Sequence, residues 1–366
     1  MRLPQELVEE IIDHLSRDYS ALKAFSLVSS HFVPRCRSHL FETCTLGPKN
    51  IFAFHNLLRA SRGCTFLPHV RAITAFRYSW SDNDHYFTAI APDLRRLTSV
   101  RSLAMKLNII VDDANADAFF RTGFVTGFPN VTELVLTCNF DGYDAQPAPL
   151  IDMICMLPAL ECLVVREMSD SATGAPTTPA LPPKGLRTLK LSAYSVGPIL
   201  SWLHKYQHLP RVQSLSLPLL LRRDAPVVRA ALQQLSGALL HFEFILTWVL
   251  DYSDVDPLTV FDLALHPNLT TLSITDRSWA DPEEFDDCHL IPFVTRLAAP
   301  ALEAVSFTLD LALYRALNWE PLDAFFASTR FPALRSVAFV RSSPQDGDFL
   351  HHALPRLSSL GVLRVG

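Results

Sequence analysis

The sequence predicts an α/β solenoid that follows a short module of three helices, and three observations lead to this prediction. One apolar pattern recurs from Phe41 to the end of the chain. Helix-like segments separate its copies, as in a strand-helix repeat. Ahead of the repeats, residues 3–32 hold two apolar helical patterns that are too short to enclose a core of their own. We therefore expect a helical module over residues 1–46 and a repeat array over residues 47–366.

The first predicted helix begins near Pro4, because proline fits the first turn of a helix. Glutamates in that turn suit the positive end of the helix dipole. Its apolar residues form two neighbouring stripes, Leu7, Ile11 and Leu15 in one and Val8 and Ile12 in the other. This apolar face is wider than one small neighbour needs, so part of it should meet either the repeat array or another protein.

Two more short helices should complete the module. Asp18 is placed to cap the second helix. The residues expected on the buried side of that helix are Ala21, Leu22, Phe25 and Val28. Pro34 fits the first turn of a third helix that ends near Leu40–Phe41.

The repeat consists of an apolar residue, two others, an apolar residue, one other and an apolar residue. The clearest copies follow a proline, as in "FPNVTELVL" and "HPNLTTLSI". The first positions fall at residues 41, 70, 100, 131, 160, 186, 212, 239, 269, 302, 334 and 357, so the steps are 23 to 33 residues long. Strands that alternate with helices make parallel pairs with right-handed crossovers, and the pattern predicts a curved array of the leucine-rich-repeat kind. A doubly wound α/β enzyme is the alternative, but it would not repeat so evenly.

Two surfaces of the array are candidates for contact with a partner. Alternation along the strands places the third, fifth and seventh residues of each repeat on the exposed concave strand face, for example His241, Glu243 and Ile245. The loops after the strands are rich in Asp and aromatic residues, whereas the segments before the strands are basic. The proposed partner-binding residues of this acidic, aromatic edge are Trp80, Tyr143, Trp248, Tyr252 and Trp279. Helix capping by Asp is the alternative explanation for the acidic residues.

Composition narrows the functional classes. The net charge is -5 and no basic stretch has the pattern of a nucleic-acid footprint. No apolar stretch has the length of a membrane span, so we expect no membrane contact. Seven scattered cysteines are typical of free, mostly buried thiols in the cytoplasm or the nucleus.

The sequence lacks the motifs that catalytic sites carry. It has no Gly-rich phosphate loop, no HExxH, no CxxC pair and no GxSxG. Neither "DDCH" at 286–289 nor the histidine pair at 351–352 completes a set of metal ligands. We expect a non-catalytic binding protein without a cofactor or a metal; an enzyme with a site assembled from distant residues is the alternative.

The residues of the helical module resemble the F-box motif. The resemblance covers about residues 3–46: Leu3-Pro4-x-Glu6, the apolar positions Leu7, Ile11 and Leu15, Asp18, Leu22, Leu27-Val28-Ser29, Phe32 and Leu40-Phe41. It is closest to mushroom-type fungal F-box proteins with degenerate leucine-rich repeats. Where the family often has Cys and Trp, this chain has Ser29 and Phe32.

The resemblance implies a substrate-recognition subunit of an SCF-type ubiquitin ligase. The module would dock on the Skp adaptor of a cullin–RING ligase, and the repeat array would hold an unknown protein substrate. The residues implied in Skp contact are Leu3, Pro4, Leu7, Ile11, Leu15, Leu27, Val28 and Phe32. The alternative is a leucine-rich-repeat scaffold unconnected with ubiquitin, whose first helices only cap the array.

Overall fold

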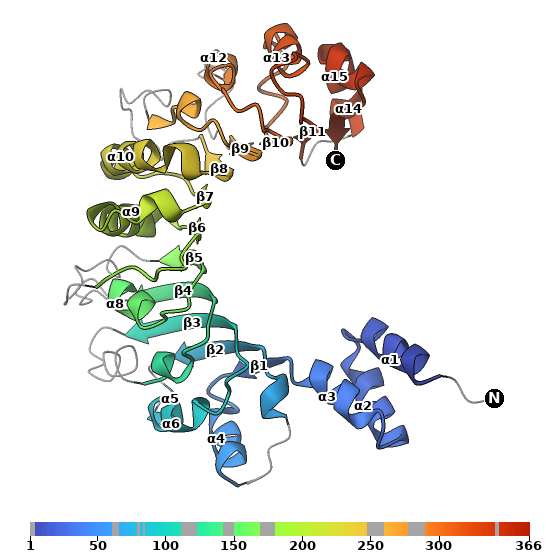
Figure 1. Cartoon of the computed structure of the whole chain (residues 1–366), viewed down its shortest axis with the longest axis vertical. Helices are drawn as coiled ribbons and strands as arrows, with labels where there is room; N and C mark the ends of the chain where they lie inside the picture. Colours follow the sequence, from blue (N-terminus) through green and yellow to red (C-terminus); the bar gives the residue numbers. More distant parts are fainter. Residues whose placement is uncertain are drawn as a thin grey trace. The chain divides into compact units, whose positions relative to one another are not determined.

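The computed structural model describes residues 4–60, 66–78, 81–82, 85–110, 123–141, 150–168, 180–246, 260–276, 290–340 and 344–366. The chain forms two compact units, Met1–Gly185 and Leu186–Gly366, which are described separately (Figure 1). The boundary that the sequence predicts after residue 46 lies inside the first unit and stays a prediction.

The first unit begins with three helices and continues with strand-helix repeats. The helices are α1 (Gln5–His14), α2 (Tyr19–Val28) and α3 (Val33–Leu40). The repeats comprise β1 (Thr43–Leu46), α4 (Ile51–Ala60), β2 (Ala72–Tyr78), α5 (His85–Ala89), α6 (Ala91–Leu94), β3 (Ser102–Ile110), β4 (Glu133–Asp141), α8 (Leu150–Cys155) and β5 (Cys162–Met168). The strands pair in parallel and in chain order from β1 to β5.

The second unit consists of the same kind of repeat. Its elements are β6 (Thr188–Lys190), α9 (Val196–Lys205), β7 (Ser214–Leu217), α10 (Ala225–Leu235), β8 (His241–Ile245), β9 (Thr271–Thr275), α12 (Leu290–Val294), β10 (Ala304–Thr308), α13 (Glu320–Phe326), β11 (Ser336–Phe339), α14 (Pro344–Ala353), α15 (Pro355–Ser359) and β12 (Leu363–Val365). These strands also pair in parallel, in order from β6 to β12.

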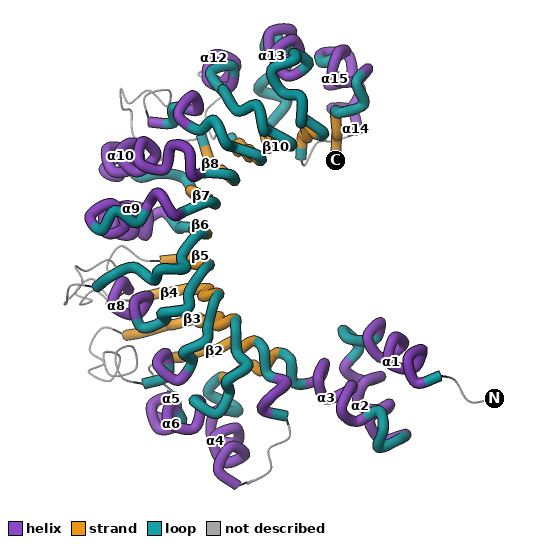
Figure 2. Tube along the Cα trace, viewed as in Figure 1, coloured by secondary structure: helices purple, strands orange, loops and turns teal. Residues whose placement is uncertain are grey.

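In each unit the strands line one side and the helices of the repeats cover the other (Figure 2). The core lies between these layers, because the first, fourth and sixth residues of a repeat point inward. In the repeat of β4, for example, Val131, Leu134 and Leu136 are each fully buried. The predicted α/β repeat array is therefore confirmed.

The repeats are joined by a recurring pair of backbone hydrogen bonds just before most strands. The carbonyl of Glu42 accepts from the N–H groups of Arg71 and Ala72, at 2.8 and 2.9 Å. The second residue of most later repeats does the same for the next repeat, as the carbonyl of Gln213 does for Leu240 and His241 at 2.8 and 3.0 Å. One carbonyl thus accepts two donors, which fixes the register of the strand that follows.

Side-chain hydrogen bonds add to these backbone bonds between adjoining repeats where the sequence is P-N-apolar-T. Asn130 donates from Nδ2 to the Thr98 carbonyl at 3.0 Å, and Asn268 donates to the Gly237 carbonyl at 2.7 Å. The threonine two residues later also donates to the preceding repeat, to the carbonyl of Arg101 or of Leu240. In these two repeats, the residues that follow the proline thus bind the preceding repeat through their side chains.

The last repeat starts three residues later than the sequence pattern predicts. The expected frame began at Leu357, but α15 occupies Pro355–Ser359 and Leu360 is 60% exposed. The strand is Leu363–Val365, whose residues pair with Val337 and Phe339 of β11. Both frames satisfy the apolar spacing, and Leu357 is buried beneath the helix layer as a helical residue instead.

Two buried histidines make the stability of the second unit depend on pH. His266 is fully buried, its Nδ1 lies 3.1 Å from the Ser236 carbonyl, and burial lowers its pKa. Burial also lowers the pKa of His208, whose Nε2 lies 3.1 Å from the Leu186 carbonyl. An imidazole with a lowered folded-state pKa adds stability that is complete above its unfolded pKa of about 6.5 and is lost as the pH falls below it.

We therefore expect the free energy of unfolding to decrease as the pH is lowered from about 6.5 to about 5, measured by urea titration at each pH. The His266→Gln variant should have a flatter profile over this range. An unchanged slope in that variant would show that His266 is not a source of the pH dependence.

The described cysteines are free thiols: Cys36, Cys44, Cys138, Cys155 and Cys162. Burial raises the pKa of Cys138 to about 12, so this thiol is protonated and unreactive at neutral pH. Among the described residues no helix is long and apolar enough to cross a membrane.

Candidate functional site

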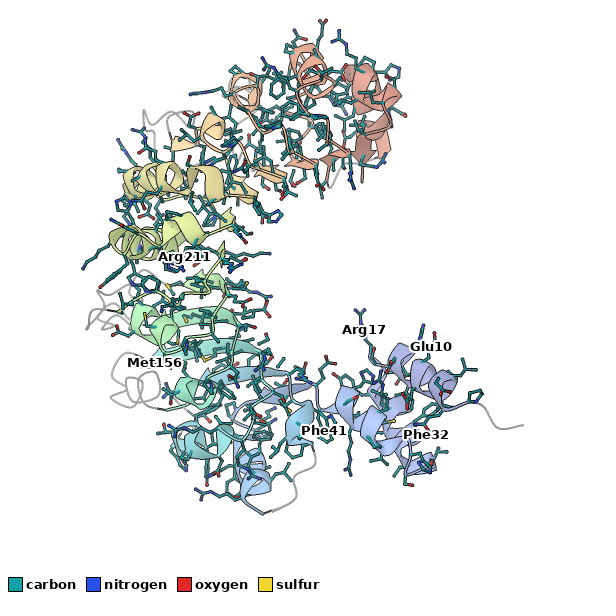
Figure 3. The ribbon with its side chains drawn as sticks, in the orientation of Figure 1. Glu10, Arg17, Phe32, Phe41, Met156 and Arg211 are labelled. Carbon is teal, nitrogen blue, oxygen red and sulfur yellow. The ribbon has the colours of Figure 1, made fainter. Side chains whose placement is uncertain are left out.

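The three N-terminal helices enclose a small core of their own. Ile12, Leu22 and Cys36, one from each helix, are fully buried. The residues packed against them are Val8, Leu15, Phe25, Phe32 and Leu40. Of the two apolar stripes of α1, the one with Val8 and Ile12 therefore faces this core, and Leu15 joins it from the other stripe. Figure 3 shows Phe32 within this module.

A charged cluster ties α1 to α3. Asp13 accepts from Arg35 Nε at 2.6 Å and also pairs with Arg35 Nη2, while His39 Nε2 lies 2.8 Å from the same carboxylate. These hydrogen bonds, first that of Arg35 and then that of His39, lower the pKa of Asp13 to about 2. The carboxylate is thus charged at neutral pH and links α1 to α3 through Arg35 and His39.

The second helix begins as the sequence predicts. The Asp18 carboxylate accepts from the N–H groups of Ser20 and Ala21, at 3.1 and 2.9 Å. Leu22 and Phe25 face the core. Val28, however, is 73% exposed, so its expected place on the buried side of the helix is wrong. The reason is local: α2 ends at Val28 and the chain turns into an extended conformation at Ser29.

Among its described residues, the module leaves four large aliphatic side chains in contact with solvent. Leu7 and Ile11, the rest of the first stripe of α1, are 47% and 42% exposed. Leu27 and Val28, at the end of α2, are 87% and 73% exposed. We call these four residues the apolar surface. Of the other residues implied in adaptor contact, Pro4 is exposed, Leu15 and Phe32 pack against the core, and Leu3 lies outside the described residues.

A groove of ≈ 680 Å³ lies between α1 and the segment that leads into α3. Its apolar floor contains Val8, Ile12 and Phe32. Its polar walls are Gln5, Glu9, Ser29, His31 and Arg35. Sequence reasoning missed these wall residues because single polar residues carry no periodic signal.

The second unit has a groove of its own on the exposed strand face. It has a volume of ≈ 370 Å³ and crosses strands β6 to β11. Its outward-pointing residues are Lys190, Ser214, Ser216, His241, Glu243, Thr271, Ser273, Ala304, Ser306, Ser336 and Ala338. His241 Nδ1 lies 2.8 Å from Thr271 Oγ1, and Ser306 donates to Ser273 Oγ at 2.9 Å. As predicted, the third and fifth residues of the repeats form this face.

The aromatic residues predicted for partner binding cannot be placed. Trp80, Tyr143, Trp248, Tyr252 and Trp279 all lie outside the described residues, as does "DDCH" at 286–289. His351 and His352 are exposed on α14 and contact Ser358 Oγ and the Asp348 carbonyl. Within the described ranges, no group of three His, Cys, Asp or Glu side chains could hold a metal ion.

Comparison with known proteins identifies no family for this chain. No family model matches the sequence, and no curated protein matches it. Among solved structures, a protein from Bacteroides fragilis is similar to it at 10% sequence identity with a TM-score of 0.37, over 88% of this chain and 73% of that one. A score of this size does not establish a common fold, so the functional argument depends on the residues of this chain.

Proposed function

We propose that this chain is the substrate-recognition subunit of an SCF-type ubiquitin ligase, in which the N-terminal helices act as an F-box and dock on a Skp adaptor. The repeat array then holds a protein substrate, and a separate enzyme of the ligase transfers ubiquitin. The chain contributes proximity and no covalent chemistry of its own.

One observation carries this proposal: the module exposes the apolar surface although it has a closed core. Leu7, Ile11 and Val28 stay in water while Ile12 and Leu22 are fully buried. Exposing four large apolar side chains within three short helices is costly, and burial against a partner would recover about 25 cal/mol per Å² of apolar area. The four positions belong to the set that the F-box resemblance assigns to adaptor contact.

The neighbouring groove supports the same proposal. Its apolar floor and polar walls suit an amphipathic helix of a partner, which would place its apolar side against Val8 and Phe32. Phe32 here lies in the floor and packs against the core, where the family often has Trp. Phenylalanine keeps the apolar contact and lacks the indole N–H donor.

The test is co-purification of the full chain with a Skp adaptor. The double variant Leu7→Asp with Ile11→Asp should lose binding, because each carboxylate would be buried without a partner. Leu57→Asp serves as the matched control, since Leu57 on α4 is 45% exposed and lies outside the module helices. The control should bind as the unchanged chain does.

Far-UV circular dichroism of both proteins separates lost docking from lost folding. Should the double variant keep its helices and still retain Skp, the chain would be a repeat scaffold whose first helices serve as a cap, as the alternative holds.

A further inference from the structure

The first two repeats of the second unit carry an unusual excess of positive charge. Between residues 186 and 240 there is a single carboxylate, Asp224, which is 7% exposed. The same segment has seven basic residues, all exposed: Arg187, Lys190, Lys205, Arg211, Arg222, Arg223 and Arg229. The chain as a whole has a net charge of -5, so this excess is a local feature.

Three of these cations gather where the chain enters strands β6 and β7. The Arg187 carbonyl accepts from Gln213 N at 2.8 Å, so the second residues of adjoining repeats lie side by side. Arg211 precedes Gln213 by two residues (Figure 3). Lys205 ends α9 and its Nζ lies 5.7 Å from the ring centre of Tyr206. In the described part of the chain, no carboxylate forms an ion pair with Arg187, Lys205 or Arg211.

The buried His208 lies close to two of these cations, Arg187 and Arg211. Its ring lies 3.1 Å from the Leu186 carbonyl, next to Arg187, and Arg211 is close enough to contribute to the lowering of its pKa, after burial. His208 thus lies beside the chain segment of Arg187 and within electrostatic reach of Arg211.

The fourth cation, Lys190, brings this charge onto the exposed strand face. Lys190 lines the groove of that face, and its neighbours in the same row are Ser216 on β7 and Glu243 on β8. Beyond Glu243 the row continues with Ser273 and Ser306. The groove is therefore positive at β6, negative at β8 and uncharged from β9 onward.

This charge order distinguishes between classes of partner. A nucleic acid presents phosphates at regular intervals and would place some of them against Glu243. It would also find no outward-pointing Phe, Tyr or Trp side chain for base stacking among the residues of the groove. A membrane surface needs apolar side chains that insert beside the cations, and the groove residues named above are polar or alanine. A polypeptide can carry carboxylates at one end and neutral or basic residues at the other.

We propose that Arg187, Lys190, Lys205 and Arg211 form a docking surface for an acidic polypeptide segment of a partner protein. The carboxylates of that segment pair with the four cations, and the segment continues without acidic residues into the groove over Ser216 and Glu243. Serine and alanine side chains on β9 to β11 leave room for its backbone to approach the sheet. This surface lies in the second unit and does not depend on adaptor docking by the N-terminal helices.

The test uses the full chain and a fluorescent peptide that alternates Glu and Ser in one half and Gly and Ser in the other, and binding is measured by fluorescence anisotropy at low salt. The double variant Arg187→Glu with Arg211→Glu should weaken binding by at least about tenfold, because like charges then face each other. The matched control is Arg71→Glu with Arg95→Glu: both are exposed, and Arg71 is the second residue of its repeat, as Arg187 is. The control should change binding by less than about twofold.

Two further measurements test whether electrostatic attraction between the peptide carboxylates and the cations drives binding. Glu243→Gln should tighten binding of the acidic peptide, since it removes the negative charge of the groove. Added salt should weaken binding to the unchanged chain and have little effect on the double variant. If the double variant loses its circular dichroism signal, Lys190→Glu, an exposed substitution on the strand face, replaces it.

Several results would overturn the proposal. They are equal binding by the two double variants, equal binding of a peptide in which Gln replaces Glu, and tighter binding of a single-stranded oligonucleotide or of phosphatidylserine vesicles than of the acidic peptide. Since Skp co-purification is measured separately on variants of α1, failure of either proposal leaves the other standing.

Discussion

Replacing Phe244 by alanine is expected to destabilise the second unit by about 3–5 kcal/mol. Phe244 is fully buried on β8, stacks on Phe261 at 4.5 Å between ring centres and meets Phe293 edge-on at 5.7 Å. Phe242 contacts it from the same strand at 4.7 Å. Alanine would leave a cavity among three rings that neighbouring repeats hold in place, so the site cannot collapse to fill it.

The measurement is urea unfolding followed by tryptophan fluorescence and circular dichroism. Phe244→Leu is the matched control and should cost about 1 kcal/mol, because it removes less volume. Similar losses for the two substitutions would mean that ring stacking, rather than filled volume, determines the stability of this part of the core.

The second large effect is expected at Asp323, a 2% exposed carboxylate on α13. It accepts from the backbone N–H groups of Arg356 and Leu357, each at 3.0 Å, and so caps the first turn of α15 from another repeat. Alanine would leave two inward-facing donors without an acceptor. The free energy of unfolding should decrease by about 2–4 kcal/mol.

Hydrogen exchange gives this prediction a local readout, since the amides of Arg356 and Leu357 should lose protection in Asp323→Ala. Asp310→Ala is the control: Asp310 also accepts from a backbone N–H, that of Ala312 at 3.1 Å, but it is exposed. Its loss should cost less than about 1 kcal/mol. Equal losses at the two positions would contradict the importance of burial.

The repeat array could be predicted because it depends on a strong periodic signal. Inward positions such as Leu134 and Leu136 must be apolar in every copy, and the spacing of three and then two residues repeats with them. The end of the array could not be predicted by the same means. Leu357 and Leu360 both begin a valid frame, and only the pairing of Leu363 with Val337 decides between them.

The helical module was predicted from its caps and stripes, with one error that has a general cause. Asp18 and Pro34 mark helix starts by local chemistry, which the sequence contains in full. The direction in which Val28 points depends on where α2 ends, and that depends on the turn at Ser29. Helix ends are weaker signals than helix starts, so the last residue of a helix is the least certain to be placed on the correct side.

The contacts that organise the candidate surfaces lie beyond sequence reasoning for a different reason. The pairing of Asp13 with Arg35 and His39 joins residues more than twenty positions apart. The polar walls of the groove in the helical module arise only when α1 packs against the segment that leads into α3. The neighbourhood of Arg187 and Arg211 likewise arises only when separate repeats are stacked. A periodic pattern reports which residues face inward, whereas a docking surface depends on which outward residues become neighbours.

The paired backbone hydrogen bonds that precede most strands have a consequence for how the sequence of such a chain can change during evolution. Because the acceptor is a main-chain carbonyl and both donors are amides, neither partner needs a particular amino acid. A gene that gains or loses one whole repeat therefore still encodes adjoining repeats that can form these backbone hydrogen bonds. The outward residues of each copy can then diverge at little thermodynamic expense, so recognition of new partners can evolve faster than the scaffold that presents them.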